Sequence, residues 1–126
     1  MVTVMMPKSV LLVEDNMDDE FIAKRILRKA GIQVIEVAND GQKALDLLLG
    51  SGEPLPELVL LDLRLPKVSG LDLLAELRRQ KRTMSLPVLV LTSSDDPKDR
   101  EICMKLGAIE YLIKPIEVRD LQKLFS

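Results

Sequence analysis

Residues 58–66 read LVLLDLRLP, a run of leucine and valine with a single carboxylate, Asp62, in its middle. A short apolar run that ends at a proline predicts a strand buried on both faces, as in a parallel sheet. An ionised group in such surroundings costs free energy unless something compensates its charge. Asp62 is therefore a candidate functional residue.

Strands and helices are expected to alternate along the whole chain. Apolar runs predict strands at residues 10–13, 33–37, 58–61, 87–91 and 110–113. Segments with the apolar spacing of helices follow each strand, with stripes of Phe21, Ile22, Ile26 and Ala30; Ala44, Leu45 and Leu48; Leu71, Leu74 and Leu77; Ile102 and Leu106; and Val118, Leu121, Leu124 and Phe125. This order predicts one α/β domain, in which helices cover both faces of a parallel sheet through right-handed crossovers.

The composition restricts the classes of function. The 126 residues are 47% hydrophobic and 30% charged, which suits one soluble domain with its own core. Because histidine is absent, Ser-His-Asp and Cys-His catalysis and the usual zinc sites are excluded. Any phosphohistidine must come from a partner. Cys103 is the only cysteine, so it has no partner for an internal disulfide, and we expect it in the core.

The charges and the apolar runs give no sign of nucleic acid or membrane binding. The net charge is -2, and the basic run of Arg78, Arg79, Lys81 and Arg82 is expected to be the solvated end of a helix. No apolar run reaches membrane-spanning length, and the first eight residues do not resemble a secretory signal. We therefore expect a cytoplasmic protein.

Polar residues follow four of the predicted strands, and the carboxyl ends of parallel strands form one edge that commonly binds ligands. They are Glu14, Asp15, Asp62, Thr92, Ser93, Ser94 and Lys114. Taken singly, these residues have simpler explanations. Asn16, Asp18 and Asp19 would cap the helix that follows, and Lys114 would be solvated. Together, however, three carboxylates repel one another without a cation, and oxygen ligands suit magnesium. The edge is therefore predicted to bind magnesium and phosphate.

Several phosphate-handling classes fit this edge poorly. No G-x-x-x-x-G-K-[ST] loop occurs, which disfavours a nucleotide hydrolase. Haloacid-dehalogenase-type phosphotransferases and Toprim-type nuclease domains carry a D-x-D arrangement after a strand. Here the window is Asp62, Leu63, Arg64, so the second acid is missing.

Four ordered segments resemble the receiver domain of two-component response regulators, of which the chemotaxis response regulator is the simplest member. They are LLVEDN (11–16), LLDLRLPKVSG (60–70), VLVLTSS (88–94) and GAIEYLIKP (107–115). The resemblance implies a flavodoxin-like, doubly wound five-stranded parallel sheet of order 2-1-3-4-5 with five helices. It extends from Ser9 to Phe125, so we expect an N-terminal tail at 1–8 and a receiver domain at 9–126.

The resemblance also implies a role for each acidic residue. Asp62 would be the phosphoacceptor, attacking a phosphoryl group on a partner histidine. Glu14, Asp15, Asp62 and the backbone carbonyl of Arg64 would hold Mg²⁺ or Mn²⁺. The side chains of Arg64 and Ser94 would tune the lifetime of the aspartyl phosphate.

Other residues would bind or report the phosphoryl group. Lys114 would pair with the carboxylate and later with a phosphoryl oxygen, and the Lys114–Pro115 peptide bond would be cis. Thr92 would donate its hydroxyl to another phosphoryl oxygen, with small Ser93 leaving room. Tyr111, on the opposite face of its strand from Lys114, would turn inward when Thr92 moves.

Such a domain is a signalling module rather than an enzyme for external substrates, although it promotes its own phosphorylation and dephosphorylation. The implied partner is a sensor histidine kinase or a histidine phosphotransfer protein. A homodimer through helix 4, strand 5 and helix 5 is a further expectation. Residues 50–57 and 91–101 resemble stand-alone regulators that partner phytochrome-type kinases. The alternatives are an unphosphorylated receiver-like interaction domain and a metal-dependent phosphatase.

Overall fold

The computed structural model describes residues 5–50 and 52–125. Residues 1–4 of the predicted tail, Ser51 in the 50–57 loop and Ser126 lie outside the described residues. The elements are β1 (Ser9–Val13), α1 (Met17–Lys29), β2 (Val34–Ala38), α2 (Gly41–Leu45), the π-helical turn η1 (Asp46–Gly50), β3 (Leu58–Leu61), α3 (Gly70–Arg79), β4 (Val88–Thr92), α4 (Pro97–Lys105), β5 (Glu110–Ile113) and α5 (Val118–Leu124).

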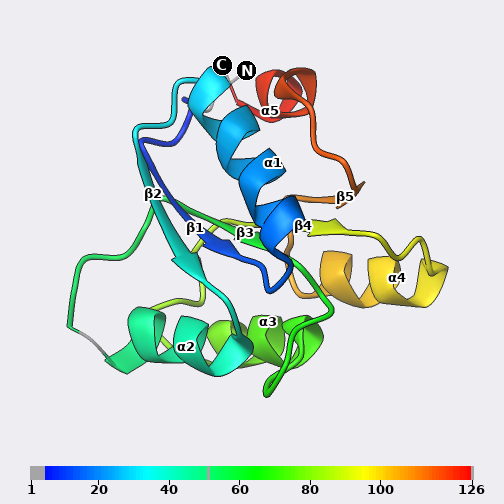
Figure 1. Ribbon diagram of the computed structural model, residues 1–126. Helices are drawn as coiled ribbons and strands as arrows, with labels where there is room; N and C mark the ends of the chain where they lie inside the picture. Colours follow the sequence, from blue (N-terminus) through cyan, green and yellow to red (C-terminus); the bar gives the residue numbers. More distant parts are fainter. Residues whose placement is uncertain (1–4, 51, 126) are drawn as a thin grey trace.

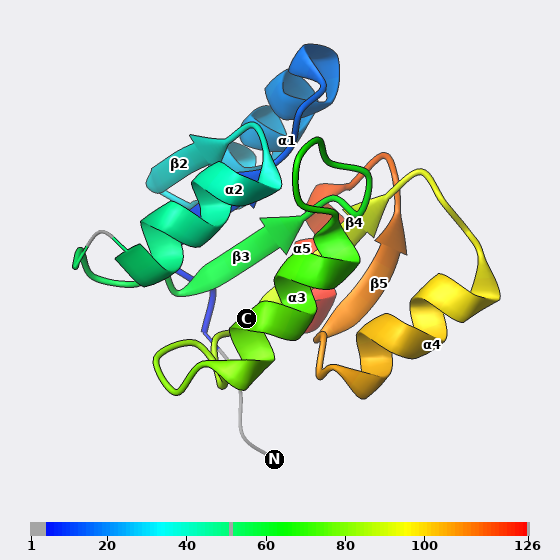
Figure 2. The ribbon, with the colours of Figure 1, turned by 90° about the horizontal axis from the view of Figure 1, so that it is seen from below.

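The five strands form one parallel sheet in the order β2-β1-β3-β4-β5 (Figures 1 and 2), which confirms the predicted flavodoxin-like topology. Helices α1 and α5 cover one face, and α2, α3 and α4 cover the other (Figure 1). Along β1, Val10 and Leu12 pack towards α1 and α5, whereas Leu11 and Val13 pack towards α2 and α3. Strands β3 and β4 are buried at every residue, which explains their unbroken leucine and valine runs.

Helix α1 buries a different face from the predicted one. Ala23 and Leu27 are buried, and Ile26 packs beside them, whereas Phe21 is 68% exposed and Ile22 is 43% exposed. The apolar residues of this helix extend over more than one face, so their spacing alone does not identify the side that meets the sheet. The predicted stripe is therefore wrong at its N-terminal end.

The basic run at the end of α3 is only partly solvated, contrary to expectation. Arg78 donates hydrogen bonds to the carbonyl oxygens of Leu86 and Leu106 at 2.8 and 2.7 Å. Arg82 donates to the carbonyl oxygen of Leu48 at 3.1 Å. The prediction was wrong for Arg78, which is half-buried because backbone carbonyls accept its N–H groups, whereas Arg79, Lys81 and Arg82 are exposed as expected.

Smaller differences concern element boundaries. Strands β2 and β4 each begin and end one residue later than predicted. At β4 the first residue of the predicted range is Pro87, which has no backbone N–H for the ladder. The second predicted helix is a short α2 continued by the π-helical turn η1.

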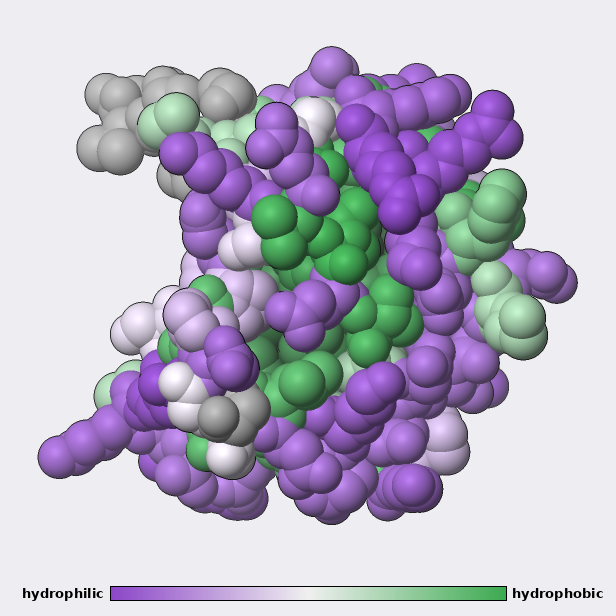
Figure 3. All heavy atoms as spheres, turned by 60° about the vertical axis from the view of Figure 1, so that its left-hand side comes forward, coloured by the Kyte–Doolittle hydropathy of each residue, from purple (hydrophilic) through white to green (hydrophobic). Residues whose placement is uncertain are grey.

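The edge of the sheet at β2 carries an apolar hollow, visible as the green region in the middle of Figure 3. A pocket of about 260 Å³ lies there, with Val34, Leu47 and Leu55 among its lining residues. Within the described ranges, no helix has the length and apolar character needed to cross a membrane.

Candidate functional site

The sheet brings the predicted polar residues to one edge. Strand register pairs Val13 of β1 with Leu61 of β3, and Thr92 of β4 with Ile113 of β5. Glu14 and Asp15 therefore follow β1, Asp62 follows β3, Thr92 ends β4 and Lys114 follows β5, all at the carboxyl ends of adjacent parallel strands. This edge is the site.

Three carboxylates form a compact cluster. One oxygen each of Glu14, Asp15 and Asp62 lies within 4.8 Å of the others. Glu14 and Asp62 are 2% and 6% exposed, whereas Asp15 faces solvent. An all-oxygen donor set with one open side is the arrangement that hard divalent cations such as Mg²⁺ and Mn²⁺ prefer. The residues present therefore fit such a cation.

Lys114 supplies the positive charge of the site. Its Nζ lies 2.7 Å from Glu14, 2.7 Å from Asp19 and 2.9 Å from Asp62. Burial opposes the charge of Lys114, but hydrogen bonds to these three carboxylates outweigh burial and raise the pKa of its ammonium above the ordinary value. Lys114 is therefore charged under all ordinary conditions. The Lys114–Pro115 peptide bond is cis.

Glu14 shows how costly the local excess of negative charge is. The pKa of Glu14 is raised from 4.5 to about 7, chiefly by burial and to a smaller extent by the neighbouring charge of Asp62. Hydrogen bonds from Lys114 and from the backbone N–H of Asn16, at 3.1 Å, lower this pKa but do not cancel the effect of burial. One ammonium is thus insufficient for the acidic residues around it.

The backbone after Asp62 is held close to that residue. The N–H of Arg64 donates to Asp62 Oδ1 at 3.2 Å, and the N–H of Gly70 donates to the carbonyl oxygen of Leu63 at 2.9 Å. A Cβ atom on Gly70 would lie 2.4 Å from the backbone oxygen of Asp62. Only glycine fits there without a backbone shift, which explains the glycine eight residues after Asp62.

Thr92 and Tyr111 are connected through the segment after β4. Thr92 is fully buried, and its Oγ1 accepts a hydrogen bond from the Ser94 N–H at 3.2 Å. The Tyr111 hydroxyl donates to the carbonyl oxygen of Ser94 at 2.6 Å, and the ring is 3% exposed. Tyr111 packs in the core on the α4 side of the sheet, and it is already inward in this structure. Ser93 is exposed beside them.

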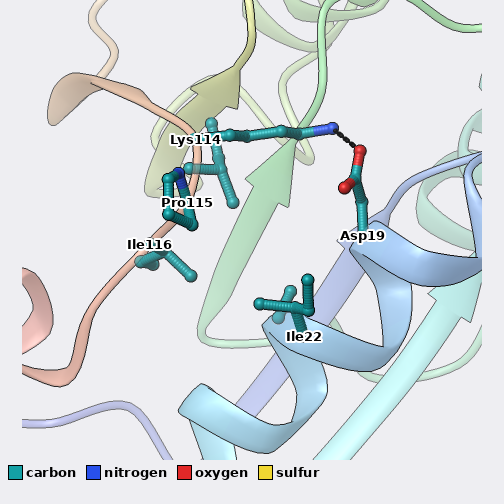
Figure 4. A pocket seen from close by; sticks show the side chains of 7 residues that line it. Asp19, Ile22, Lys114, Pro115 and Ile116 are labelled. Atoms are coloured by element: carbon teal, nitrogen blue, oxygen red, sulfur yellow. Dashed lines mark hydrogen bonds and ion pairs between the residues drawn. The ribbon is translucent and has the colours of Figure 1, made fainter.

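Asp19 is a site residue that sequence reasoning missed. Its position in the first turn of α1 suggested a role in helix capping, but the cap of α1 is Asn16. The Asp19 carboxylate instead points at the Lys114 ammonium (Figure 4). The sequence offered no signal for this contact, because Asp15 precedes α1 and the spacing of the two acids therefore defines no common helix face.

A small apolar pocket lies beside this ion pair (Figure 4). It measures about 180 Å³ and lies between α1 and the segment after β5, lined by Asp19, Ile22, Ala23, Leu91, Lys114, Pro115 and Ile116. The site therefore combines a buried carboxylate, an ammonium, an acidic cluster and an adjacent apolar hollow.

Comparison with known proteins identifies the family. The model of the response regulator receiver domain matches residues 10–126. The probable methanogenesis regulatory protein FilR2 of Methanothrix harundinacea is 40% identical over 121 residues, which cover 93% of this chain and 78% of that protein. CpxR of Escherichia coli is longer: at 41% identity over 112 residues, the match covers 89% of this chain but 45% of that protein.

Solved structures agree with this assignment. The bacteriophytochrome response regulator AtBRR superposes with a TM-score of 0.83 at 35% identity, covering 94% of this chain and 89% of that one. The Mn²⁺-bound form of response regulator Rcp1 gives a TM-score of 0.80 at 35% identity, covering 94% and 88%. The chain thus belongs to the response regulator receiver family, and residues 10–126 match the receiver domain of a two-component response regulator.

Proposed function

We propose that Asp62 accepts a phosphoryl group from a phosphohistidine of a sensor histidine kinase or a histidine phosphotransfer protein, and that the domain signals through this modification. The observation that carries the proposal is the Asp62 carboxylate itself. It is 6% exposed at the carboxyl edge of the sheet, 2.9 Å from the Lys114 ammonium. No structural need of the core explains an acid in that position.

The transfer would proceed by displacement at phosphorus. An oxygen of Asp62 forms the new O–P bond while the P–N bond to the partner's imidazole breaks, and the bonding electron pair stays on that nitrogen. Lys114 would neutralise charge on Asp62 and then on a phosphoryl oxygen. Later attack by water at phosphorus would break the Asp62 O–P bond and release inorganic phosphate. The domain would promote both of these steps on itself.

A divalent cation would be held by Glu14, Asp15, Asp62 and the backbone carbonyl of Arg64. When bound, Mg²⁺ or Mn²⁺ would neutralise the carboxylates and the incoming phosphoryl oxygens. The acidic cluster supports this assignment, and the Mn²⁺-bound form of Rcp1 shows such a cation in a structural relative.

Thr92 and Ser93 would adapt to the phosphoryl group, and Tyr111 would transmit the change to the surface of α4, β5 and α5. The hydrogen bond from Tyr111 to the Ser94 carbonyl supports this route, because Ser94 also bonds Thr92. That surface would mediate homodimerisation. Direct nucleic acid binding and membrane binding are not part of the proposal.

Helix α1 offers a surface for the phosphohistidine partner. Met17 is 82% exposed and Phe21 is 68% exposed, and Ile22 extends this apolar surface to the pocket beside Lys114. We also propose that the protein is cytoplasmic. Residues 9–126 would form the receiver domain, and residues 1–8 would form a tail that precedes it.

The experiment is phosphorylation of the purified chain by acetyl phosphate, followed by intact-mass spectrometry with Mg²⁺ or with excess chelator. We expect one phosphoryl group per chain with Mg²⁺, and none with chelator. Absence of modification under every condition would favour the unphosphorylated interaction domain. Sustained turnover of an external phosphate ester would favour the phosphatase.

A further inference from the structure

Asp19 stands apart from the other acids that contact Lys114. It lies on α1 rather than at a strand end, and its oxygens are not among those of the cluster formed by Glu14, Asp15 and Asp62. Its backbone N–H is capped by Asn16 at 2.9 Å, which leaves its own carboxylate free to reach Lys114 at 2.7 Å. Asp19 thus contributes charge to the site without belonging to the cation cluster.

The hydrogen bonds of Lys114 are fully used in this structure. An ammonium has three N–H groups, and Lys114 has three carboxylate partners at 2.7 to 2.9 Å. A phosphoryl oxygen on Asp62 can take over the bond that Lys114 now donates to Asp62, and the phosphoryl group gains a second bond from Lys114 only if Glu14 or Asp19 is released. The Asp19 side chain is 37% exposed, against 2% for Glu14, so water can solvate the Asp19 carboxylate most readily after release.

We propose that Asp19 is a positioning residue that competes with the phosphoryl group for Lys114. It holds the ammonium while Asp62 is unmodified, and it opposes the phosphorylated form. Two physical effects act in the same direction. The Asp19 carboxylate occupies an N–H of Lys114 that could otherwise bind a second phosphoryl oxygen, and its charge repels the phosphoryl group. This inference rests on the proposed role of Asp62 as phosphoacceptor.

The substitution that isolates the charge is Asp19→Asn. The amide oxygen of asparagine still accepts a hydrogen bond from Lys114, so the shape of the site is kept while one negative charge is removed. At saturating Mg²⁺, we expect Asp19→Asn to bind the phosphoryl mimic beryllofluoride on the order of tenfold more tightly than wild type, as expected for removal of a like charge at a partly exposed site.

Two variants serve as controls. Asp18→Asn removes the same charge from the exposed neighbouring position, which does not contact Lys114, and should change the affinity little. Asp19→Glu retains the negative charge and should bind beryllofluoride with an affinity close to that of wild type. Affinity for Mg²⁺ alone should weaken or stay constant in Asp19→Asn, since a negative charge is lost. Tighter binding of beryllofluoride without tighter binding of Mg²⁺ separates competition for Lys114 from a general effect on folding.

The measurement is a titration followed by ¹⁹F nuclear magnetic resonance of free and bound beryllofluoride. If wild type binds and Asp19→Asn binds no more tightly than Asp18→Asn, the role of Asp19 is overturned while that of Asp62 stands. If wild type does not bind beryllofluoride, the phosphoacceptor role and this inference fall together. The supporting result is tighter binding of beryllofluoride by Asp19→Asn, with no such gain in Asp19→Glu or Asp18→Asn.

Discussion

Gly70 shows how tightly the backbone packs around Asp62. Replacing it with alanine would place a Cβ atom 2.4 Å from the Asp62 carbonyl oxygen and 2.5 Å from the Leu63 Cα, both backbone atoms that cannot move independently. We expect Gly70→Ala to lower the free energy of unfolding by about 2 kcal/mol or more, and to weaken beryllofluoride binding. Urea unfolding followed by circular dichroism measures the first effect.

Gly50→Ala is the matched control for this substitution. No heavy atom lies within 4 Å of a Cβ built there, and the site ends a helical turn. Its free energy of unfolding should stay within about 1 kcal/mol of wild type. Equal destabilisation by the two alanines would show that packing around Asp62 is not the cause.

Individual residues of the site could be predicted when they follow a strand. Glu14, Asp15, Asp62 and Lys114 all lie where parallel topology brings strand ends together, so the order of elements predicts their proximity. Asp19 could not be placed in this way, because its partner Lys114 is 95 residues away in the sequence. The contact between them depends on how α1 is rotated on the sheet.

At the scale of elements, Arg78 joins the end of α3 to two loops. Its guanidinium donates to five backbone carbonyls, those of Thr83, Met84, Leu86, Leu106 and Gly107. Arg78→Met would leave several of these carbonyls without a partner, so we expect a loss of about 3 kcal/mol in the free energy of unfolding. Chemical denaturation provides the measurement.

The neighbouring arginine gives the comparison for Arg78. Among the described residues, Arg79 forms its ion pair with Glu76 on the exposed side of the same helix, so Arg79→Met should leave the urea midpoint nearly unchanged. Similar losses in both variants would contradict a specific role for Arg78 in holding the loops.

The hydrogen bonds that join Thr92 of β4 through Ser94 to Tyr111 of β5 lead to a prediction about dimerisation. If Thr92 and Tyr111 bias one two-state element, beryllofluoride should promote dimerisation in wild type but much less in Thr92→Ala and Tyr111→Ala. A coupling of about 1 to 3 kcal/mol is typical. Tyr111→Phe retains the ring and should keep most of the response.

Sedimentation velocity with and without the mimic measures this coupling. Undiminished dimerisation in both alanine variants would reject the route through Thr92 and Tyr111, whatever the state of Asp62.

Elements differ in how well their sequences predict them. Strands β3 and β5 match their predicted ranges, and for β3 the reason is that polar Glu57 and Asp62 flank its apolar run directly. The buried face of α1 was not predictable, since Phe21 and Ile22 are as apolar as the residues that meet the sheet. Their exposure reflects where the sheet lies, which the sequence of one helix does not contain.

At the scale of the whole molecule, Cys103 reports opening of the core. It is fully buried, and burial, with a smaller contribution from the charge of Asp99, raises the pKa of its thiol from 9.0 to about 11. The thiolate fraction at pH 8 is therefore about 100-fold below that of the unfolded chain, before access is considered. Iodoacetamide should accordingly modify the native protein at least 100-fold more slowly than the urea-unfolded protein.

The same pKa shift has a consequence for stability. A raised folded-state pKa means that the contribution of Cys103 is fully present below pH 9 and is lost as the pH rises towards 11. Cys103→Ser should lessen this part of the alkaline loss of stability.

Rapid native alkylation at pH 8 would show that the core opens more readily than its burial indicates.

Direct identification of the modified residue is the sharpest test of whether Asp62 carries the phosphoryl group. After treatment with acetyl phosphate and Mg²⁺, borohydride reduction converts an aspartyl phosphate to homoserine, which peptide mass spectrometry can locate. We expect homoserine at position 62 in wild type and in the surface control Asp72→Asn, and none anywhere in Asp62→Asn. Homoserine at another acidic residue of wild type, or undiminished phosphorylation of Asp62→Asn, would contradict this expectation.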